Sequence, residues 1–380
     1  MARRRTRIVV SLLAIAGWAI AAAPSASATT ISGTPFSGWQ TNGRVNAIVV
    51  GSNGWVYLAG TFTQVTDHSG HTFSRTRMAA IDKAGSLTAF NPKPNAAVRA
   101  LAVAANGTVY FGGDFTDVGT TGRNRLAAVS SRGALQTGFA AGANSSVYAL
   151  AVSAGEVYVG GNFTTIRGFT RTRLARVSAA TGALDSTWKP TANALVRALA
   201  VPAGARTVFV GGTFTRVDAT TQDHLASLAV GAGAVRPWKT HTDYAVWGLA
   251  ASATSVYIAG AGNGGHMTAF AYPSGTRRWT VQTDGNFQTV AVVGQDVVGG
   301  GHFTRTCKLN TNCTNPVSHP RLLAANAATG VVDAGWVPQP NSLHGVYALA
   351  ANATDLYAGG DFTVVGATAQ AHLAEFAVTP

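Results

Sequence analysis

The stretch VYVGGNFTTIRGFTRTRLARVSAATGALDSTWKPTANALVRALAV, residues 157–201, decides the fold. It contains three short apolar runs, VYVGG, LARVS and VRALAV, which are separated by turn residues such as Gly, Asn and Thr. Runs this short are typical of β-strands, because a helix would need a longer segment with a period near 3.6 residues. A fourth segment, which carries Trp188, lies between LARVS and VRALAV. The stretch therefore predicts a unit of four short strands.

The same unit recurs along the chain with a period of about fifty residues. Its first strand is found seven times: VNAIVV from Val45, VRALAV from Val98, VYALAV from Val147, VRALAV from Val196, VWGLAA from Val246, FQTVAV from Phe287 and VYALAA from Val346. A glycine signature of the form GG-x-FT ends the second strand, at Thr63, Thr116, Thr164, Thr215, Thr304 and Thr363, with a degenerate copy at Asn263. Repeats of four short strands are the pattern of a β-propeller.

The two ends of the chain supply complementary parts of one unit. The N-terminal part carries only a fourth-segment aromatic, Trp39, before the first strand, and the C-terminal part stops after a third strand, HLAEFAV (372–378). Pairing these parts in one sheet would remove open edges. We therefore predict an all-β, seven-bladed β-propeller of four-stranded antiparallel blades, closed by pairing the N-terminal and C-terminal segments in one blade, with residues 29–380 as a single domain.

Residues 1–28 have the layout of a secretory signal peptide. Four arginines precede an apolar run from Ile8 to about Ala23, and the small-residue site Ala26-Ser27-Ala28 follows. The run is short for a membrane span, and no later run is long enough, so we predict no membrane span and a secreted, extracellular protein. Cleavage lowers the formal net charge from +13 to +9. The mature part has no block of five basic residues, so we expect no nucleic-acid partner.

The unit quoted above resembles the delta-60-type repeats of secreted bacterial β-propellers, which are similar to kelch repeats. The resemblance covers residues 31–380 and implies the fold, but no single function, because such propellers serve many roles. TGALDSTW (181–188) and SGTRRWTV (274–281) also resemble the repeats of quinoprotein propellers. Those proteins bind a quinone and calcium through a carboxylate cluster and often adjacent cysteines. Neither feature is present, so we expect no cofactor.

Composition disfavours several functional classes. Charged residues are only 11% of the chain and hydrophobic ones 47%, which argues against disorder. Two cysteines are too few for a cysteine-rich metal cluster, and we expect no metal site. G-x-S-x-G and H-E-x-x-H motifs are absent, and the only glutamates are Glu156 and Glu375. A non-enzymatic role is therefore favoured, although Asp114, Asp117 and Asp361 beside the glycine turns leave a hydrolase or lyase open.

Residues that are repeated in nearly every unit are interpreted as scaffold. The fourth-segment aromatics are expected to act as wedges between blades, since each can bury ~150–250 Å². A cation precedes each third strand and is expected to bond backbone carbonyls or the nearby Thr: Arg77, Arg125, Arg173, His224, His266, Arg321 and His372. An Asn or Asp precedes each first strand and is expected to close a turn.

The second residue of the first strand varies while its neighbours stay constant. The seven copies have Asn46, Arg99, Tyr148, Arg197, Trp247, Gln288 and Tyr347. In a propeller the first strand lines the central channel, so these side chains are predicted to meet at one mouth. Two interpretations stay open: the side chains plug the channel, or they form a binding mouth for a polar ligand.

Two units carry long loops between their second and third strands, at residues 63–77 and 305–321. The seventh unit has extra residues before its first strand, and in a closed ring these three units are neighbours. They predict a ligand surface that adds five histidines to the mouth residues: His68, His71, His302, His319 and His344. The alternative is that the insertions are merely tolerated at the surface. Cys307 and Cys313 flank KLNTN in an exported chain and are predicted to form a disulfide.

Together these features predict a secreted, monomeric, non-enzymatic propeller that binds an extracellular glycan or protein partner through one loop face. The alternative is a secreted carbohydrate-active hydrolase or lyase on the same scaffold. The sequence alone does not name the ligand.

The export prediction has a direct test. Cleavage after Ala28 should give secreted material whose N-terminal sequence begins at Thr29. Secreted protein that retains Met1 would contradict it.

Overall fold

The structure is a computed structural model, and it describes residues 29–202, 204–238, 242–262, 264–307 and 316–379. Every regular element in these residues is a β-strand. The described part has no helix long and apolar enough to cross a membrane. The predicted signal peptide lies outside the described residues.

Three strands form the body of each main sheet. The innermost strands are β3 (Val45–Val50), β8 (Val98–Val103), β13 (Val147–Ser153), β18 (Val196–Ala200), β23 (Ala245–Ala251), β27 (Asn286–Val293) and β32 (Val346–Ala351). The second strands are β4 (Val56–Gly60), β9 (Val109–Gly113), β14 (Glu156–Gly161), β19 (Thr207–Gly212), β24 (Ser255–Gly262), β28 (Asp296–His302) and β33 (Asp355–Gly360). The third strands are β7 (Met78–Ile81), β12 (Leu126–Val129), β17 (Leu174–Ser178), β22 (Leu225–Ala229), β25 (Gly264–Ala271), β31 (Leu322–Asn326) and β36 (Leu373–Thr379).

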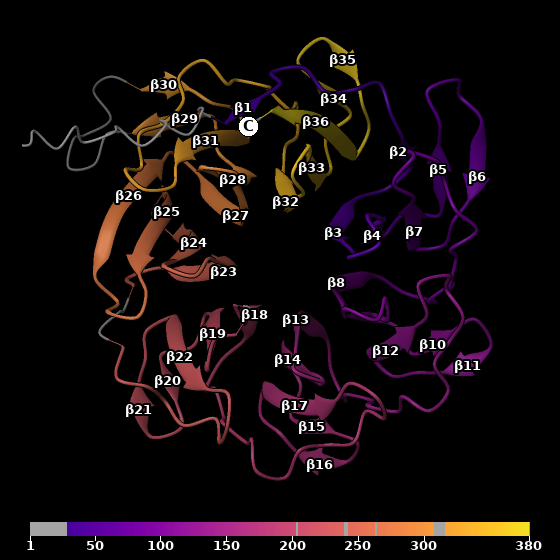
Figure 1. Cartoon of the computed structure of the whole chain (residues 1–380), viewed down its shortest axis with the longest axis vertical. Helices are drawn as coiled ribbons and strands as arrows, with labels where there is room; N and C mark the ends of the chain where they lie inside the picture. The colour runs from indigo at the N-terminus through magenta and orange to yellow at the C-terminus, as the bar shows by residue number, and fades with distance from the viewer. Residues whose placement is uncertain (1–28, 203, 239–241, 263, 308–315, 380) are drawn as a thin grey trace, which may run out of the picture.

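These sheets stand around a common centre. Each innermost strand contacts the innermost strand of the next sheet, and β32 contacts β3. The second and third strands follow outward in antiparallel order. Figure 1 shows the sheets radiating from the central opening. The chain is therefore an all-β protein with a β-propeller arrangement.

The core lies between neighbouring sheets. Fourth-segment aromatics are buried in it, as predicted, at Phe90, Phe139, Trp188, Trp238 and Trp336. Three of them meet a tyrosine of a second strand edge to face, with ring centroids 5.2–5.3 Å apart. Such pairs add to the stabilisation from buried area. Trp39 and Trp279 are only half-buried, so they fit the wedge role less well.

The fourth segment is less regular than predicted. Only β26 (Arg277–Thr283) and β1 (Thr30–Ile31) are fourth strands in the described residues. Five other sheets have a single bridge instead, such as Val177↔Leu184. Several of these segments continue into proline, as at Pro92 and Pro190. Because proline lacks the N–H that a ladder needs, the segment leaves the sheet after one bridge.

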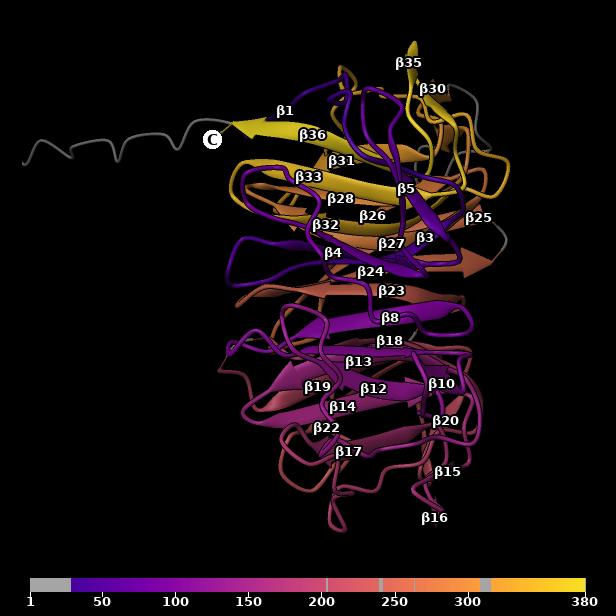
Figure 2. The same ribbon diagram turned by 90° about the vertical axis from the view of Figure 1, so that its right-hand side faces the viewer.

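The ends of the described chain pair with each other in one sheet. Thr30 pairs with Thr379 and Ile31 with Val378, which places β1 beside β36 (Figure 2). The element around Trp39 joins the same sheet, because the Phe36 N–H donates to the Glu375 carbonyl at 2.8 Å and Gln370 Nε2 donates to the Trp39 carbonyl at 3.0 Å. Trp39 Nε1 donates to the Gly85 carbonyl on the first sheet at 2.8 Å, just as Trp188 Nε1 donates to the Ala229 carbonyl on the sheet after its own.

Small hairpins connect most second and third strands at the periphery. They are β5 (Gln64–Thr66) with β6 (Thr72–Ser74), β10 (Asp117–Val118) with β11 (Thr121–Gly122), β15 (Thr165–Ile166) with β16 (Phe169–Thr170), β20 (Arg216–Val217) with β21 (Thr220–Thr221), β29 (Arg305–Cys307) with β30 (Val317–Ser318), and β34 (Val364–Val365) with β35 (Thr368–Ala369). Each pairs with the segment that leads into its own innermost strand, for example β5 with β2 (Gln40–Thr41). Figure 1 places them at the outer edge, away from the opening.

Close backbone approach explains the glycine pair. A Cβ on Gly113 would lie 2.2 Å from the Ala97 carbonyl oxygen, just before its own innermost strand. A Cβ on Gly112 would lie 2.4 Å from Val147 Cγ1, on the next sheet. Neither glycine has a positive φ, so the requirement is space rather than backbone conformation.

We expect Gly113→Ala to lower the free energy of unfolding by about 1–3 kcal/mol, because the backbone carbonyl must move to admit the methyl group. Gly122→Ala is the matched control, since a Cβ there meets nothing within 4 Å. Denaturant unfolding of both variants measures the difference. Equal stability of the two would contradict the close-approach explanation.

Candidate functional site

A β-bulge occurs at the same place in every innermost strand. The register shifts lie between Val45 and Ala47, Val98 and Ala100, Val147 and Ala149, Val196 and Ala198, Val246 and Gly248, Phe287 and Thr289, and Val346 and Ala348. The extra residue in each case is the variable second residue identified from the sequence. A bulge redirects the side chain of its extra residue. The scaffold therefore presents seven variable side chains in seven equivalent positions.

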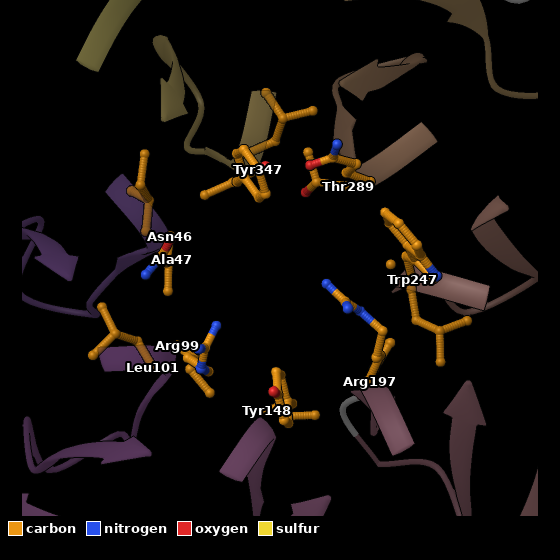
Figure 3. Close-up of a pocket in the computed structure, with 18 of the residues that line it drawn as sticks. Asn46, Ala47, Arg99, Leu101, Tyr148, Arg197, Trp247, Thr289 and Tyr347 are labelled. Atoms are coloured by element: carbon orange, nitrogen blue, oxygen red, sulfur yellow. The ribbon is translucent and has the colours of Figure 1, made fainter. Parts of the chain in front are cut away.

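These side chains meet in one cavity of about 270 Å³ at the central opening. All seven line it, and five of the residues predicted as ligand-binding are among them: Arg99, Tyr148, Arg197, Trp247 and Tyr347. Figure 3 shows these five around the opening, with Arg197 directed into it. The next two residues of each innermost strand also line the cavity. The first of them is small, such as Ala198, and the second is aliphatic, such as Leu199. The cavity thus combines a polar and aromatic rim with an apolar wall.

Arginine and aromatic side chains alternate along part of this rim. The Arg44 guanidinium carbon lies 4.5 Å from the Tyr347 ring centroid. Arg197 lies 4.5 Å from the Trp247 ring and 5.7 Å from the Tyr148 ring. Each distance is within the range of a cation–π interaction. Each of these guanidinium groups therefore lies against an aromatic ring of the rim.

Arg99 is neutralised by an acidic partner. It contacts Tyr148 at 5.0 Å and forms an ion pair with Asp114, with Nη2 and Oδ2 2.7 Å apart. Burial alone would raise the pKa of Asp114, but hydrogen bonds from Arg99 and Ser146 outweigh it and the pKa is lowered. The hydrogen bonds to Asp114 raise the pKa of Arg99. This pair joins the rim to the glycine turn of the second strand.

Arg197 differs from Arg99 in having no such partner. Among the described residues, none forms a hydrogen bond or an ion pair with its side chain. Burial lowers its pKa, and the nearby charge of Arg99 acts in the same direction. Arginine nevertheless stays charged in proteins. The cavity therefore contains a guanidinium whose N–H donors no described residue uses.

Two charged residues of this site, Arg44 and Asp114, were not among the residues predicted to meet at the mouth. Arg44 directly precedes β3, lines the cavity and donates to Asn46 Oδ1 at 2.9 Å. Asp114 holds Arg99. A signal for Arg44 exists in the sequence, because no other unit has a cation immediately before its first apolar residue. Asp114 was singled out in the sequence only as a possible catalytic carboxylate, whereas the structure pairs it with Arg99.

The histidines do not gather at this site. His68 lies beside a second groove at the periphery, and His71 pairs there with Asp67 at 3.2 Å. His302 and His344 are exposed, and the His344 carbonyl accepts a hydrogen bond from Gln288 at 2.8 Å. His319 is fully buried. The predicted ligand surface is therefore wrong in placing His319 at the surface, because its ring is enclosed by the protein. His68 and His71 lie in an outer hairpin rather than at the mouth.

The repeated cations mostly serve the scaffold, as expected. Arg77, Arg173 and Arg321 donate to backbone carbonyls, at 3.2, 3.0 and 2.6 Å for their shortest contacts. Six of the seven positions have φ between 65° and 68°, so each marks a sharp bend before the third strand. The Asn residues that precede the first strands also serve the scaffold. Asn95, for example, accepts a hydrogen bond from the Thr116 backbone N–H and donates one to the Thr116 hydroxyl. Asp117 and Asp361 also have hydrogen-bond partners, Asn95 and Ser342.

A second groove of about 890 Å³ lies where the ends of the chain meet the first sheet. Its lining includes Phe36, which is 51% exposed, and Phe73, which is 39% exposed. Burial raises the pKa of Glu375, and the charge of Asp355 raises it further. The Tyr357 hydroxyl donates to Glu375 Oε1 at 3.2 Å. Exposed aromatic rings and four carboxyl groups, those of Asp67, Asp82, Asp355 and Glu375, thus line one groove.

Two of the predictions are not settled by these residues. No group of three His, Cys, Asp or Glu side chains in the described part is arranged to hold a metal ion. Cys313 and the side chain of Cys307 lie outside the described residues, so the disulfide stays a prediction.

The fold and the central cavity define the protein as a β-propeller. A family described as a domain of unknown function (DUF5122) beta-propeller matches residues 155–187, which span β14 to β17 and the start of the fourth segment. The WD40 β-propeller domain of Doa1 is similar in structure, with a TM-score of 0.60 at 12% identity over 90% of this chain and 97% of that chain.

The computationally designed Ika8 protein gives a TM-score of 0.54 at 15% identity, over 92% of this chain and 100% of that chain. Both likenesses concern the fold alone. No curated protein matches the chain.

We expect Asp114→Asn to cost about 1 kcal/mol at neutral pH, since the ion pair is about one-third exposed. The pKa of Asp114 is lower in the folded state, so this stabilisation is present above about pH 4 and is lost as the pH falls through the folded-state pKa. The difference between variant and wild type should therefore shrink in acid. Thermal unfolding between neutral and acidic pH measures it.

Asp223→Asn is the control, because no described residue bonds the Asp223 side chain. A deficit for Asp114→Asn that is the same at every pH would contradict the assignment.

Proposed function

We propose that this chain is an extracellular, non-enzymatic β-propeller whose central mouth binds a glycan. The observation that carries the proposal is the set of seven bulged positions, where a constant backbone presents Arg, Tyr, Trp, Asn and Gln to one cavity. Aromatic rings suit the faces of sugar rings, and the polar groups suit hydroxyls. Variation confined to the lining is the arrangement expected of a recognition site on a repeated scaffold.

Size favours a glycan over a protein partner. The cavity of about 270 Å³ is close to the lower end of small-molecule sites, which begin near ~300 Å³. A stable protein interface needs about 800 Å² from each partner. The cavity is concave and small, so a short saccharide suits it better than a protein surface.

The finer description of the molecule is part of the proposal. The ring of contacts among innermost strands and the pairing of β1 with β36 support a closed, seven-bladed propeller. The predicted signal peptide supports secretion. A closed ring leaves only short outer edges, which favours a monomer.

A glycan array probed with the secreted protein tests this function. We expect binding to a limited set of glycans, and loss of it in Trp247→Ala and Tyr347→Ala, each by about tenfold or more. Phe169→Ala is the control, because it removes an exposed aromatic from an outer hairpin. Thermal unfolding confirms that each variant is folded.

An empty array, or binding that both mouth variants retain, would contradict the proposal. Capture of a protein partner through another face would do the same.

The second groove favours a second candidate function, a carbohydrate-active hydrolase or lyase. A carboxyl group whose pKa is raised is suited to act as a general acid, and Glu375 lies beside exposed aromatics. Product analysis on a panel of polysaccharides tests this candidate. Activity that disappears in Glu375→Gln would support this candidate function. If no polysaccharide of the panel gives products, the candidate function is excluded for the substrates tested.

A further inference from the structure

We propose that Arg197 is an oxyanion receptor, so that the mouth selects acidic glycans over neutral ones. The inference rests on the proposed function for its setting, but the anion site itself is argued from the described contacts. It commits the ligand to a sugar that carries a carboxylate or a sulfate group.

The first step is the charge of the cavity. Its described lining contains three arginines, Arg44, Arg99 and Arg197, and no acidic residue. Asp114 lies behind the rim and offsets Arg99. Arg44 uses part of its donor set on Asn46. An excess of positive charge therefore remains at the opening, and a concave site concentrates its field.

The second step is the geometry of Arg197. Its guanidinium lies against Trp247 and near Tyr148, so aromatic rings supply the contacts that an acid supplies to Arg99. A cation–π contact uses none of the N–H donors of the guanidinium, and no described residue accepts a hydrogen bond from Arg197, so these donors are free for a ligand. Figure 3 shows the side chain directed into the opening. Free in-plane donors are the arrangement that binds a carboxylate or a sulfate.

The third step is the free-energy cost of leaving the Arg197 guanidinium without an opposite charge. Arg197 is half-buried, and burial disfavours its charge. A charged group that is partly removed from water gains most when an opposite charge joins it. An anionic ligand would supply that charge, while a neutral sugar would not.

Four probes test the inference by titration against the secreted protein: methyl glucuronide, glucose 6-sulfate, methyl glucoside and inorganic sulfate. The indole N–H signal of Trp247, identified with Trp247→Phe, reports occupancy in an NMR spectrum. We expect at least one acidic sugar to bind about tenfold or more tightly than the glucoside, and added salt to weaken only the charged probes. The carboxylate and sulfate arms show which anion is preferred.

Arg197→Gln should remove the preference for acidic sugars, and Arg197→Lys should keep part of it. Arg132→Gln is the matched control, since it makes the same change of charge at an exposed turn. Equal affinity for acidic and neutral sugars, no binding of any charged probe, or an unchanged preference in Arg197→Gln would overturn the inference.

The outcomes also separate this inference from the proposed function. Binding of neutral glycans at the mouth without an acidic preference would leave the function standing and remove the anion receptor. Binding of inorganic sulfate that depends on Arg197, with no glycan bound at all, would do the reverse.

Discussion

The close approach between the glycine pair of a second strand and the bulged start of its innermost strand is the constraint on which the rest of the structure depends. The second glycine gives room to the carbonyl that precedes the bulge, and the first receives a valine of the next sheet. One short sequence therefore sets the register within a sheet and the contact between sheets. Five second strands meet this constraint with a glycine pair, whereas β4 and β24 have Ala59 and Ala259 at its first position. The repeated arrangement helps the sheets to repeat around one centre.

Sequence repetition predicted the parts of the fold that this constraint controls. The innermost strands begin at, or one residue before, the predicted positions, and Arg77, Arg173 and Arg321 bond backbone carbonyls as expected. The fourth segments were predicted less well: in four of the five single-bridge segments a proline follows the bridge and overrides the strand pattern, whereas the segment after Leu135 has none. Trp39 was recognised by its fourth-segment aromatic, whereas the strand before it, Thr30 and Ile31, has no distinctive signature and was not predicted.

The candidate site shows the same division. Variation at one position predicted which side chains would meet at the mouth, because a repeated backbone places equivalent residues equivalently. Loop insertions were a poorer guide: the hairpin that carries His68 extends to the periphery, and His319 is buried. Loop length says little about direction or depth. Contacts between different units, such as Arg44 with Tyr347, also depend on β32 lying against β3 and are not visible within any single repeat.

Three arginines around one opening would repel each other if the site held them in the same way, and the structure balances them differently. Asp114 neutralises Arg99 by a direct ion pair, whereas aromatic rings are the contacts of Arg197. An aromatic face attracts a cation without carrying a charge, so it holds the guanidinium in place and leaves its net charge uncompensated. The position of Arg197 is set by a β-bulge, which is a feature of the backbone and does not depend on the type of side chain. The backbone therefore determines where the side chain lies, and the residue type determines its charge. The same backbone can present a different chemistry wherever the second residue of an innermost strand changes.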